Sequence, residues 1–222
     1  ADVLALQQGS RNLNDGTAFV KTAEGALNEI SGILLRLRSL ASQSANGTIG
    51  DVERISTDLE YQASIRELDR IVATTEFNGT FLLDGTLAAS QPDSAHNVLQ
   101  LGVDSRSDNQ IDLNNILDLT NVGTAALGLT GSNITTQGAA FQALNDLTAS
   151  IDDLIQVRGR VGTAQIRMLH ALDNLQVQEE NLNAAVSTIR DADLAEELTI
   201  LTKNQLLVQA GVAMVGQANL NP

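Results

Sequence analysis

The side chains in this sequence that could carry chemistry are two histidines and a few groups of carboxylates. His96 and His170 stand far apart in different expected elements, so we expect each to be an isolated surface or bundle residue rather than a catalytic base or metal ligand. The stretch "DADLAEE", residues 191–197, places four carboxylates within seven residues, a set that could hold a divalent cation. It lacks the Asp-x-Asp-x-Asp-Gly spacing and the distant Glu of a calcium loop. A solvated helix start, with Asp191 or Asp193 as N-cap, is therefore favoured.

Composition and motifs argue against an enzyme. The chain has no cysteine and no tryptophan, and aromatic residues make up 2% of it. No HExxH, GxSxG, GxGxxG or phosphate-binding glycine loop occurs. Glu179 and Glu180 lie between apolar heptad positions and form a polar face rather than a carboxylate pair in a cleft. We therefore expect no catalytic residue, no metal and no cofactor.

The charge of the chain narrows the class of partner. A net charge of −14 disfavours binding to nucleic acid or to an anionic membrane. The sequence contains no run of eighteen apolar residues, so membrane insertion is not expected either.

The elements that must position these side chains are long helices. In the C-terminal half, apolar residues recur every seven positions, which is typical of a helix that packs along a partner. These rod-core residues are Leu147, Leu154, Val161, Met168, Leu175, Leu182 and Ile189. The pattern predicts one long helix over about residues 139–190.

The N-terminal half supplies the partner helices. Val20, Leu27 and Leu34 form a row with the same seven-residue spacing, within a helix expected over about 3–44. The small polar run "QSANGT" then ends the helix, with Asn46-Gly47 as the expected C-terminal cap. A second helix is expected over about 51–74, with an apolar stripe of Val52, Ile55, Leu59, Ile65, Leu68 and Val72.

The middle of the chain, about 76–138, has a different character. In "FNGTFLLDGT", Asn-Gly and Asp-Gly flank an apolar run, the pattern of a hairpin. "NVLQLGV" and "NQIDLN" alternate like strands. The predicted fold is mainly α, an elongated antiparallel helical bundle or coiled-coil rod with a small β-hairpin insertion. Its expected parts are N-terminal helices (1–75), a hairpin and loop subregion (76–138), a long rod helix (139–190) and part of a terminal helix (191–222).

Four stretches of the sequence resemble bacterial flagellin, and they follow one another in flagellin order. They are "SRNLNDGTAFVKTAEGALNEI" (10–30), "LRSLASQSANGT" (37–48), "ELDRIVATTEFNGTFLLDG" (67–85) and "TIRDADLAEELTILTKNQLLVQAGVAMVGQAN" (188–219). The resemblance covers nearly the whole chain except about 86–138. Because both ends fall inside helical patterns, we expect a flagellin chain truncated at both ends.

The resemblance implies a structural subunit of the bacterial flagellar filament that polymerises with other flagellin subunits through long helical faces. It also implies secretion to the extracellular flagellum, and an export chaperone that binds the C-terminal helix. Two alternatives remain open. One is the hook–filament junction protein, and the other is a cell-surface flagellin homologue that binds polysaccharide or metal.

The stretch "LLRLRSLASQSANGT", residues 34–48, is either an ordinary helix end or a surface that a partner contacts. In flagellins like those of enteric bacteria, the innate-immune Toll-like receptor for flagellin docks on this helix. The resemblance places receptor contacts at Arg36, Leu40 and Gln43 on the first helix and at Glu60 on the second, with Arg38 joining the patch.

The chemistry of these residues suits a receptor contact, although the match is incomplete. Arg36 offers a planar fork, and Leu40 is expected to be an apolar anchor. However, Leu35, Ser39 and Ser42 stand where those flagellins more often have a Gln, an acidic residue and a larger apolar residue. The alternative interpretation is that the stretch chiefly makes contacts between subunits.

Overall fold

The structure is a computed structural model that describes residues 2–102, 104, 106–190 and 194–219. The chain divides into two units, 1–176 and 177–222, which are described separately. The first unit contains helices α1 (Asp2–Ala45), α2 (Asp51–Thr74), α3 (Leu113–Leu117) and most of α4 (Gln137–Arg190). The second contains the end of α4 and α5 (Leu194–Asn219). The prediction of a mainly α fold with a small β insertion is confirmed.

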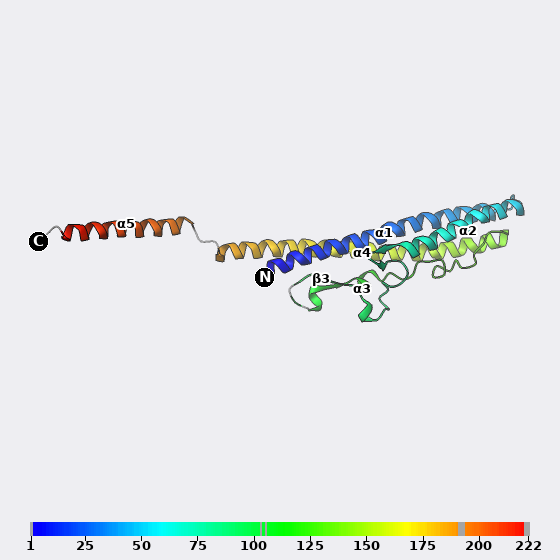
Figure 1. The fold of residues 1–222 in the computed structure, drawn as a ribbon. Coiled ribbons are helices and arrows are strands. Elements are labelled where there is room, and N and C mark those ends of the chain that lie inside the picture. Colours follow the sequence, from blue (N-terminus) through cyan, green and yellow to red (C-terminus); the bar gives the residue numbers. More distant parts are fainter. Residues whose placement is uncertain (1, 103, 105, 191–193, 220–222) are drawn as a thin grey trace. The chain divides into compact units, whose positions relative to one another are not determined.

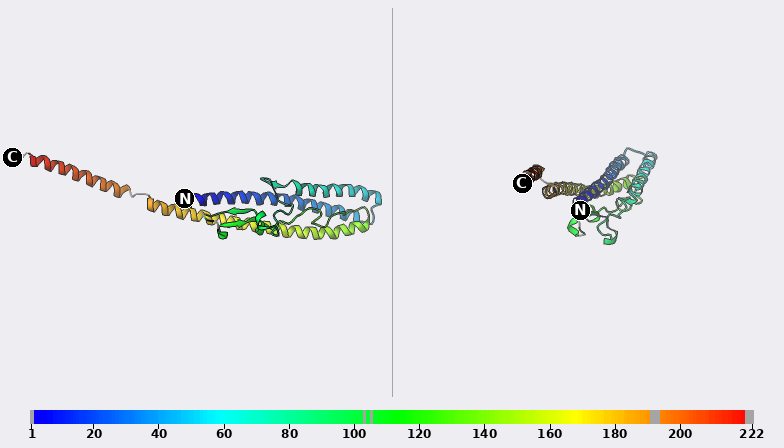
Figure 2. Two further views of the ribbon diagram at one scale, coloured as in Figure 1. Left: turned by 60° about the horizontal axis from the view of Figure 1, so that its bottom comes forward. Right: turned by 60° about the vertical axis from the view of Figure 1, so that its left-hand side comes forward.

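Helices α1, α2 and α4 lie side by side in the first unit (Figures 1 and 2). Two contacts show that α4 runs antiparallel to α1. Gln137, at the start of α4, donates to the carbonyl of Ala45, at the end of α1, over 3.0 Å. Further along both helices, the Gln165 amide donates to Glu24.

The core of the first unit is formed by heptad rows of α1 and α4. Most members of the expected rows are buried: Val20, Leu27, Leu34, Leu147, Leu154, Val161, Met168 and Leu175. Leu182 is half-buried, and the side chain of Ile189 lies outside the described residues. Each buried Leu of this kind contributes about 1.5–3 kcal/mol relative to an exposed one, so the rows are the main source of stability.

The β structure consists of two small antiparallel pairs. β1 (Glu76–Phe77) and β2 (Thr80–Phe81) flank Asn78-Gly79, whose φ angles of 50° and 80° are those a tight two-residue hairpin requires. β3 (Val98–Gln100) pairs with β4 (Gln110–Asp112). Short 3-10 turns, η1 (Asp93–Ala95) and η2 (Ser107–Asn109), precede these strands. Asp112 then caps α3 by accepting from the backbone N–H of Asn115 over 3.2 Å.

The loop between α3 and α4 is held on α2 by side chains that bond to its backbone. Asp69 accepts from both the N–H and the hydroxyl of Thr124, over 2.9 and 2.8 Å. Asp58 accepts from the N–H of Ile134 over 2.9 Å. Tyr61 is fully buried, its hydroxyl is 2.7 Å from that of Ser132, and burial raises its pKa. These contacts fix an otherwise irregular segment, because they satisfy backbone groups that no helix or strand pairs.

A close approach of the chain to α1 explains one glycine. A Cβ on Gly9 would lie 2.0 Å from the carbonyl oxygen of Leu101, just beyond β3. We expect Gly9→Ala to lower the free energy of unfolding by about 1–3 kcal/mol, since backbone must move. Gly25, also in α1, has open space around it, so Gly25→Ala should stabilise by up to about 1 kcal/mol through helix propensity. Urea denaturation of both variants measures the difference; equal stabilities would contradict the close approach.

Candidate functional site

The corner between α1 and α2 decides which side chains of the two helices face each other. Arg54 is 7% exposed, and its guanidinium donates to the carbonyls of Ser44 and Asn46 over 2.9 and 3.0 Å. A third N–H reaches the carboxylate of Asp51 at 2.9 Å. Helix α1 ends at Ala45, directly before the expected cap at Asn46-Gly47, and neither of these two described residues has a positive φ. The side chain of Arg54 caps this end of α1, by bonding carbonyls that the helix leaves unpaired.

Arg36 and Glu60, two members of the predicted receptor patch, meet across the α1–α2 pair. The Arg36 Nε–H donates to Glu60 Oε1 over 2.9 Å, and a second guanidinium N–H reaches the same oxygen. Their side chains are 56% and 51% exposed. An exposed pair of this kind contributes at most about 1 kcal/mol to stability. Both groups can therefore bind a partner without loss of the fold.

The other predicted patch residues differ in their surroundings. Leu40 is 2% exposed and packs in the core, so it cannot be the exposed apolar anchor that we expected. Gln43 and Arg38 are exposed. Residues two apart on a helix point about 200° away from each other, so Arg38 and Arg36 do not share a face. Leu40 occupies a buried heptad position between Leu37 and Ser44, which explains the burial.

The apolar stripe expected on α2 is only half correct. Leu68 and Val72 are buried, but Val52, Ile55 and Leu59 are 78%, 54% and 68% exposed. The buried face of α2 runs through Arg54, Tyr61 and Leu68, which are also spaced by seven residues. Because Arg and Tyr were not counted as core residues, the apolar pattern pointed to a different face. Leu59, beside Glu60, is therefore exposed apolar surface at the patch.

Helix α5 presents apolar side chains that its own unit leaves exposed. Leu206, Leu207 and Val208 follow one another at steps of about 100°, so they cover several sides of the helix. Large exposed residues continue along its length: Leu198, Ile200, Leu201, Leu206, Leu207, Val208, Val212, Met214 and Val215. Within the described part of the chain, residues 196–217 are long and apolar enough to cross a membrane by length and composition. This helix is not an unbroken apolar run, because Thr202, Lys203, Asn204 and Gln205 interrupt it, and the absence of membrane insertion stays a prediction.

The groups considered for chemistry at the outset are placed as follows. His170 is exposed, whereas His96 is not isolated, because it pairs with Asp112. Residues 191–193 of the carboxylate run lie outside the described residues. Among 2–102, 104, 106–190 and 194–219, no three His, Cys, Asp or Glu side chains are grouped to hold a metal ion.

The sequence matches two family models that together span most of its helices. The model of the bacterial flagellin N-terminal helical region matches residues 1–88, and that of the C-terminal helical region matches residues 144–222. A flagellin of Halalkalibacterium halodurans is 37% identical over 222 residues, which are 100% of this chain and 78% of that protein. The chain belongs to the bacterial flagellins.

Two further relatives agree on a structural role for this flagellin. A flagellar filament 30.7 kDa core protein of Treponema maltophilum is 34% identical over 98% of this chain and 77% of its own length. The crystal structure of Bacillus cereus flagellin superposes with a TM-score of 0.61 at 31% identity, covering 79% of this chain and 94% of that one. The chain is a structural subunit of the flagellar filament, which is extracellular. The junction-protein and polysaccharide-binding alternatives gain no support from these relatives.

Several residues that fix the α1–α2 corner and the loop between α3 and α4 were not found by sequence reasoning. Arg54, Asp58, Tyr61 and Asp69 fix the corner and the loop, and Asn114 is fully buried among backbone groups. The one available signal was their spacing, since positions 54, 61 and 68 continue a heptad on α2. The backbone groups that the side chains of Asp58, Asp69 and Asn114 bond lie 17 to 76 residues away, so local pattern did not reveal them.

Proposed function

We propose that this flagellin joins the filament chiefly through α5 and through the helical faces of its first unit that remain exposed. The observation that carries the proposal is the apolar surface of α5, exposed along its whole described length. A helix that exposes large apolar side chains on several sides needs cover from other protein or from lipid. Identical helices of neighbouring subunits provide that cover in a polymer, and burial of each large side chain contributes about 1.5–3 kcal/mol.

The same surface supports a route of secretion. Before assembly, α5 would expose its apolar residues to solvent and favour aggregation. An export chaperone that binds the C-terminal helix covers them until the chain leaves through the secretion channel of the flagellum. The two roles are compatible, because chaperone and neighbouring subunit use α5 at different times.

A second part of the proposal concerns the host. The exposed patch of Arg36, Gln43, Leu59 and Glu60 is the surface that the Toll-like receptor for flagellin binds on the monomer. The pair of opposite charges gives the patch its directional contacts, and Leu59 gives it apolar surface. Leu40 supports the patch from beneath, and Arg38 lies outside it.

The test of the receptor site uses two matched charge pairs on the same chain. Arg36→Ala with Glu60→Ala should weaken binding of the flagellin monomer to the receptor ectodomain by about tenfold or more, which corresponds to about 1.4 kcal/mol. The control is Arg70→Ala with Glu67→Ala, an exposed pair within α2 whose two N–O contacts are 2.8 and 2.6 Å. Surface plasmon resonance measures both. Equal affinities of the two double variants would remove the patch from the proposal.

A further inference from the structure

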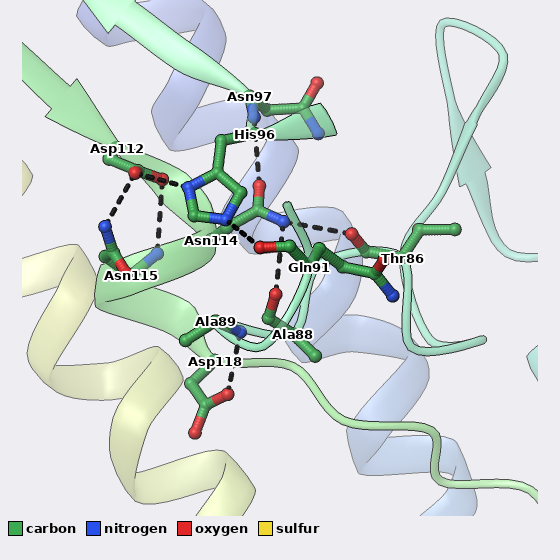
Figure 3. A network of polar contacts seen from close by, with 10 residues as sticks. All are labelled: Thr86, Ala88, Ala89, Gln91, His96, Asn97, Asp112, Asn114, Asn115 and Asp118. Carbon is green, nitrogen blue, oxygen red and sulfur yellow. Dashed lines mark hydrogen bonds and ion pairs between the residues drawn. The ribbon is translucent and has the colours of Figure 1, made fainter. Parts of the chain in front are cut away.

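A buried histidine closes a segment of chain that we call the strap, residues 86–97, between β2 and β3. The imidazole of His96 is 4% exposed. Its Nδ1 lies 2.6 Å from a carboxylate oxygen of Asp112, and its Nε2 lies 2.9 Å from the carbonyl oxygen of Gln91 (Figure 3). Both neighbours are acceptors. A neutral ring has one N–H to donate, whereas the protonated ring donates from both nitrogens. The geometry therefore fits the protonated ring.

The rest of the strap is fastened by groups that do not titrate near neutral pH. The fully buried Asn114 donates to the carbonyl of Thr86 over 2.9 Å and accepts from the N–H of Asn97 over 2.9 Å (Figure 3). Asp118 accepts from the N–H of Ala89 over 2.9 Å. Amides do not ionise, and carboxylates titrate in acid. The contacts of His96 are thus the part of this network that changes near neutrality.

We propose that protonated His96 is a latch that closes the strap onto the start of α3, and that loss of its proton frees residues 91–96. Asn114 continues to hold the strap at Thr86 and Asn97. Asp112 remains in place when the latch opens, because it also accepts from Asn115 as the N-cap of α3. The opening is therefore local, and the helical core does not take part.

The charges around the ring favour its protonated form. Asp112, at the end of β4, raises the pKa of His96 through its hydrogen bond. Burial opposes this effect, while the Gln91 carbonyl and the charge of Asp93 in η1 add to it. Asp118 and its α4 partner Arg160, with 3.9 Å between N and O, lie at the other end of the network, on Ala89.

The direction of the pH effect follows from the raised pKa. The closed strap is fully stabilised below the ordinary histidine pKa of about 6.5, and this stabilisation is lost as pH rises through the raised value. Between the two values, the ratio of open to closed strap rises about tenfold per pH unit. The surface of the strap would then differ between mildly acidic and alkaline surroundings of the filament.

The first experiment is a histidine titration of the whole chain by NMR. We expect the midpoint of His96 to lie above the ordinary histidine value of about 6.5. In Asp112→Asn, which keeps an oxygen for the α3 cap, we expect the midpoint of His96 to fall to that ordinary value or lower. A native His96 midpoint at or below about 6.5 would overturn the proposal, as would one unmoved by Asp112→Asn.

The second experiment follows backbone hydrogen exchange between pH 6 and 9, the span about the ordinary histidine pKa and above it. Residues 91–96 should lose protection relative to residues 124–134, which Asp69 and Asp58 hold on α2. In His96→Gln, the side chain has one donor nitrogen and does not titrate. Residues 91–96 of this variant should therefore be equally open at every pH. A native strap whose relative protection does not change with pH, or an unchanged pH dependence in His96→Gln, would overturn the latch. Asp112→Asn keeps the test decisive if His96→Gln does not fold.

Discussion

Replacing Arg54 by methionine is expected to lower the free energy of unfolding of the first unit by about 1–3 kcal/mol. The guanidinium is the capping group for the carbonyls of Ser44 and Asn46, and both Arg54 and Ser44 are buried. A buried acceptor left without a donor costs about 1–3 kcal/mol, and the carbonyl of Ser44 is left in that state, whereas the carbonyl of Asn46 still accepts from the N–H of Ile49 over 3.3 Å. Methionine retains most of the packing volume, so the loss measures the hydrogen bonds. Urea denaturation followed by circular dichroism gives the value.

Two further variants separate the fork geometry from charge and from helix propensity. Arg54→Lys keeps the positive charge near the end of α1 but offers no planar fork, so an intermediate loss is expected. Arg66→Met, at an exposed position of α2, should change stability by no more than about 0.5 kcal/mol. If Arg54→Met and Arg66→Met had the same effect, Arg54 would not be the group that holds the corner. The Arg36–Glu60 pair should also separate in Arg54→Met, because the corner sets the register of α2 on α1.

Placing charges on α5 is expected to abolish filament formation without unfolding the first unit. Leu201 and Val208 are 52% and 66% exposed and seven residues apart, so they lie on one face of the helix. Burial of a lysine ammonium against apolar neighbours without a partner charge costs several kcal/mol per ion, more than the leucine or valine contributed. The double variant Leu201→Lys with Val208→Lys should therefore leave cells without filaments and non-motile. Electron microscopy and swimming assays measure both.

The matched control keeps length and flexibility and changes only polarity. Methionine and lysine have similar helix propensities, so Leu201→Met with Val208→Met should form filaments at nearly the native level. Protein recovered from the medium shows whether the lysine variant was exported before assembly failed. Normal filaments from the lysine variant would mean that this face of α5 is not buried between subunits.

The helices and the hairpin of this chain were predictable because each depends on a local sequence pattern. The row from Leu147 to Leu175 needs only a seven-residue repeat, and the β1–β2 turn needs only Asn78-Gly79. The observed α1, α2 and α4 begin and end within two residues of the expected bounds. Such features can be recognised without knowing which residues are neighbours in the folded structure.

The candidate site was harder to predict, because its geometry depends on which helix face turns inward. Leu40 belongs to the buried face of α1, so it cannot be an exposed apolar contact for the receptor. On α2, Arg54 and Tyr61 occupy core positions, so the exposed face carries Leu59 instead. Arg36 and Glu60 were placed by family resemblance, and their contact required the α1–α2 register that Arg54 sets.

The latch at His96 could not be predicted from spacing either. Its partner Asp112 is 16 residues away, and the two meet only because β3 and β4 pair and α3 begins where β4 ends. A histidine and an aspartate at such a separation carry no pattern of their own. Sequence reasoning therefore treated His96 as isolated, and the strand register overturned that interpretation.

The most direct test of the central claim is electron microscopy of a strain whose only flagellin gene is the one that encodes this chain. The account predicts filaments on these cells, subunits that contact one another through α5 and the exposed faces of α1, α2 and α4, and loss of both filaments and swimming when the gene is deleted. Cells that build no filament from this protein, or filaments in which α5 faces solvent, would contradict it.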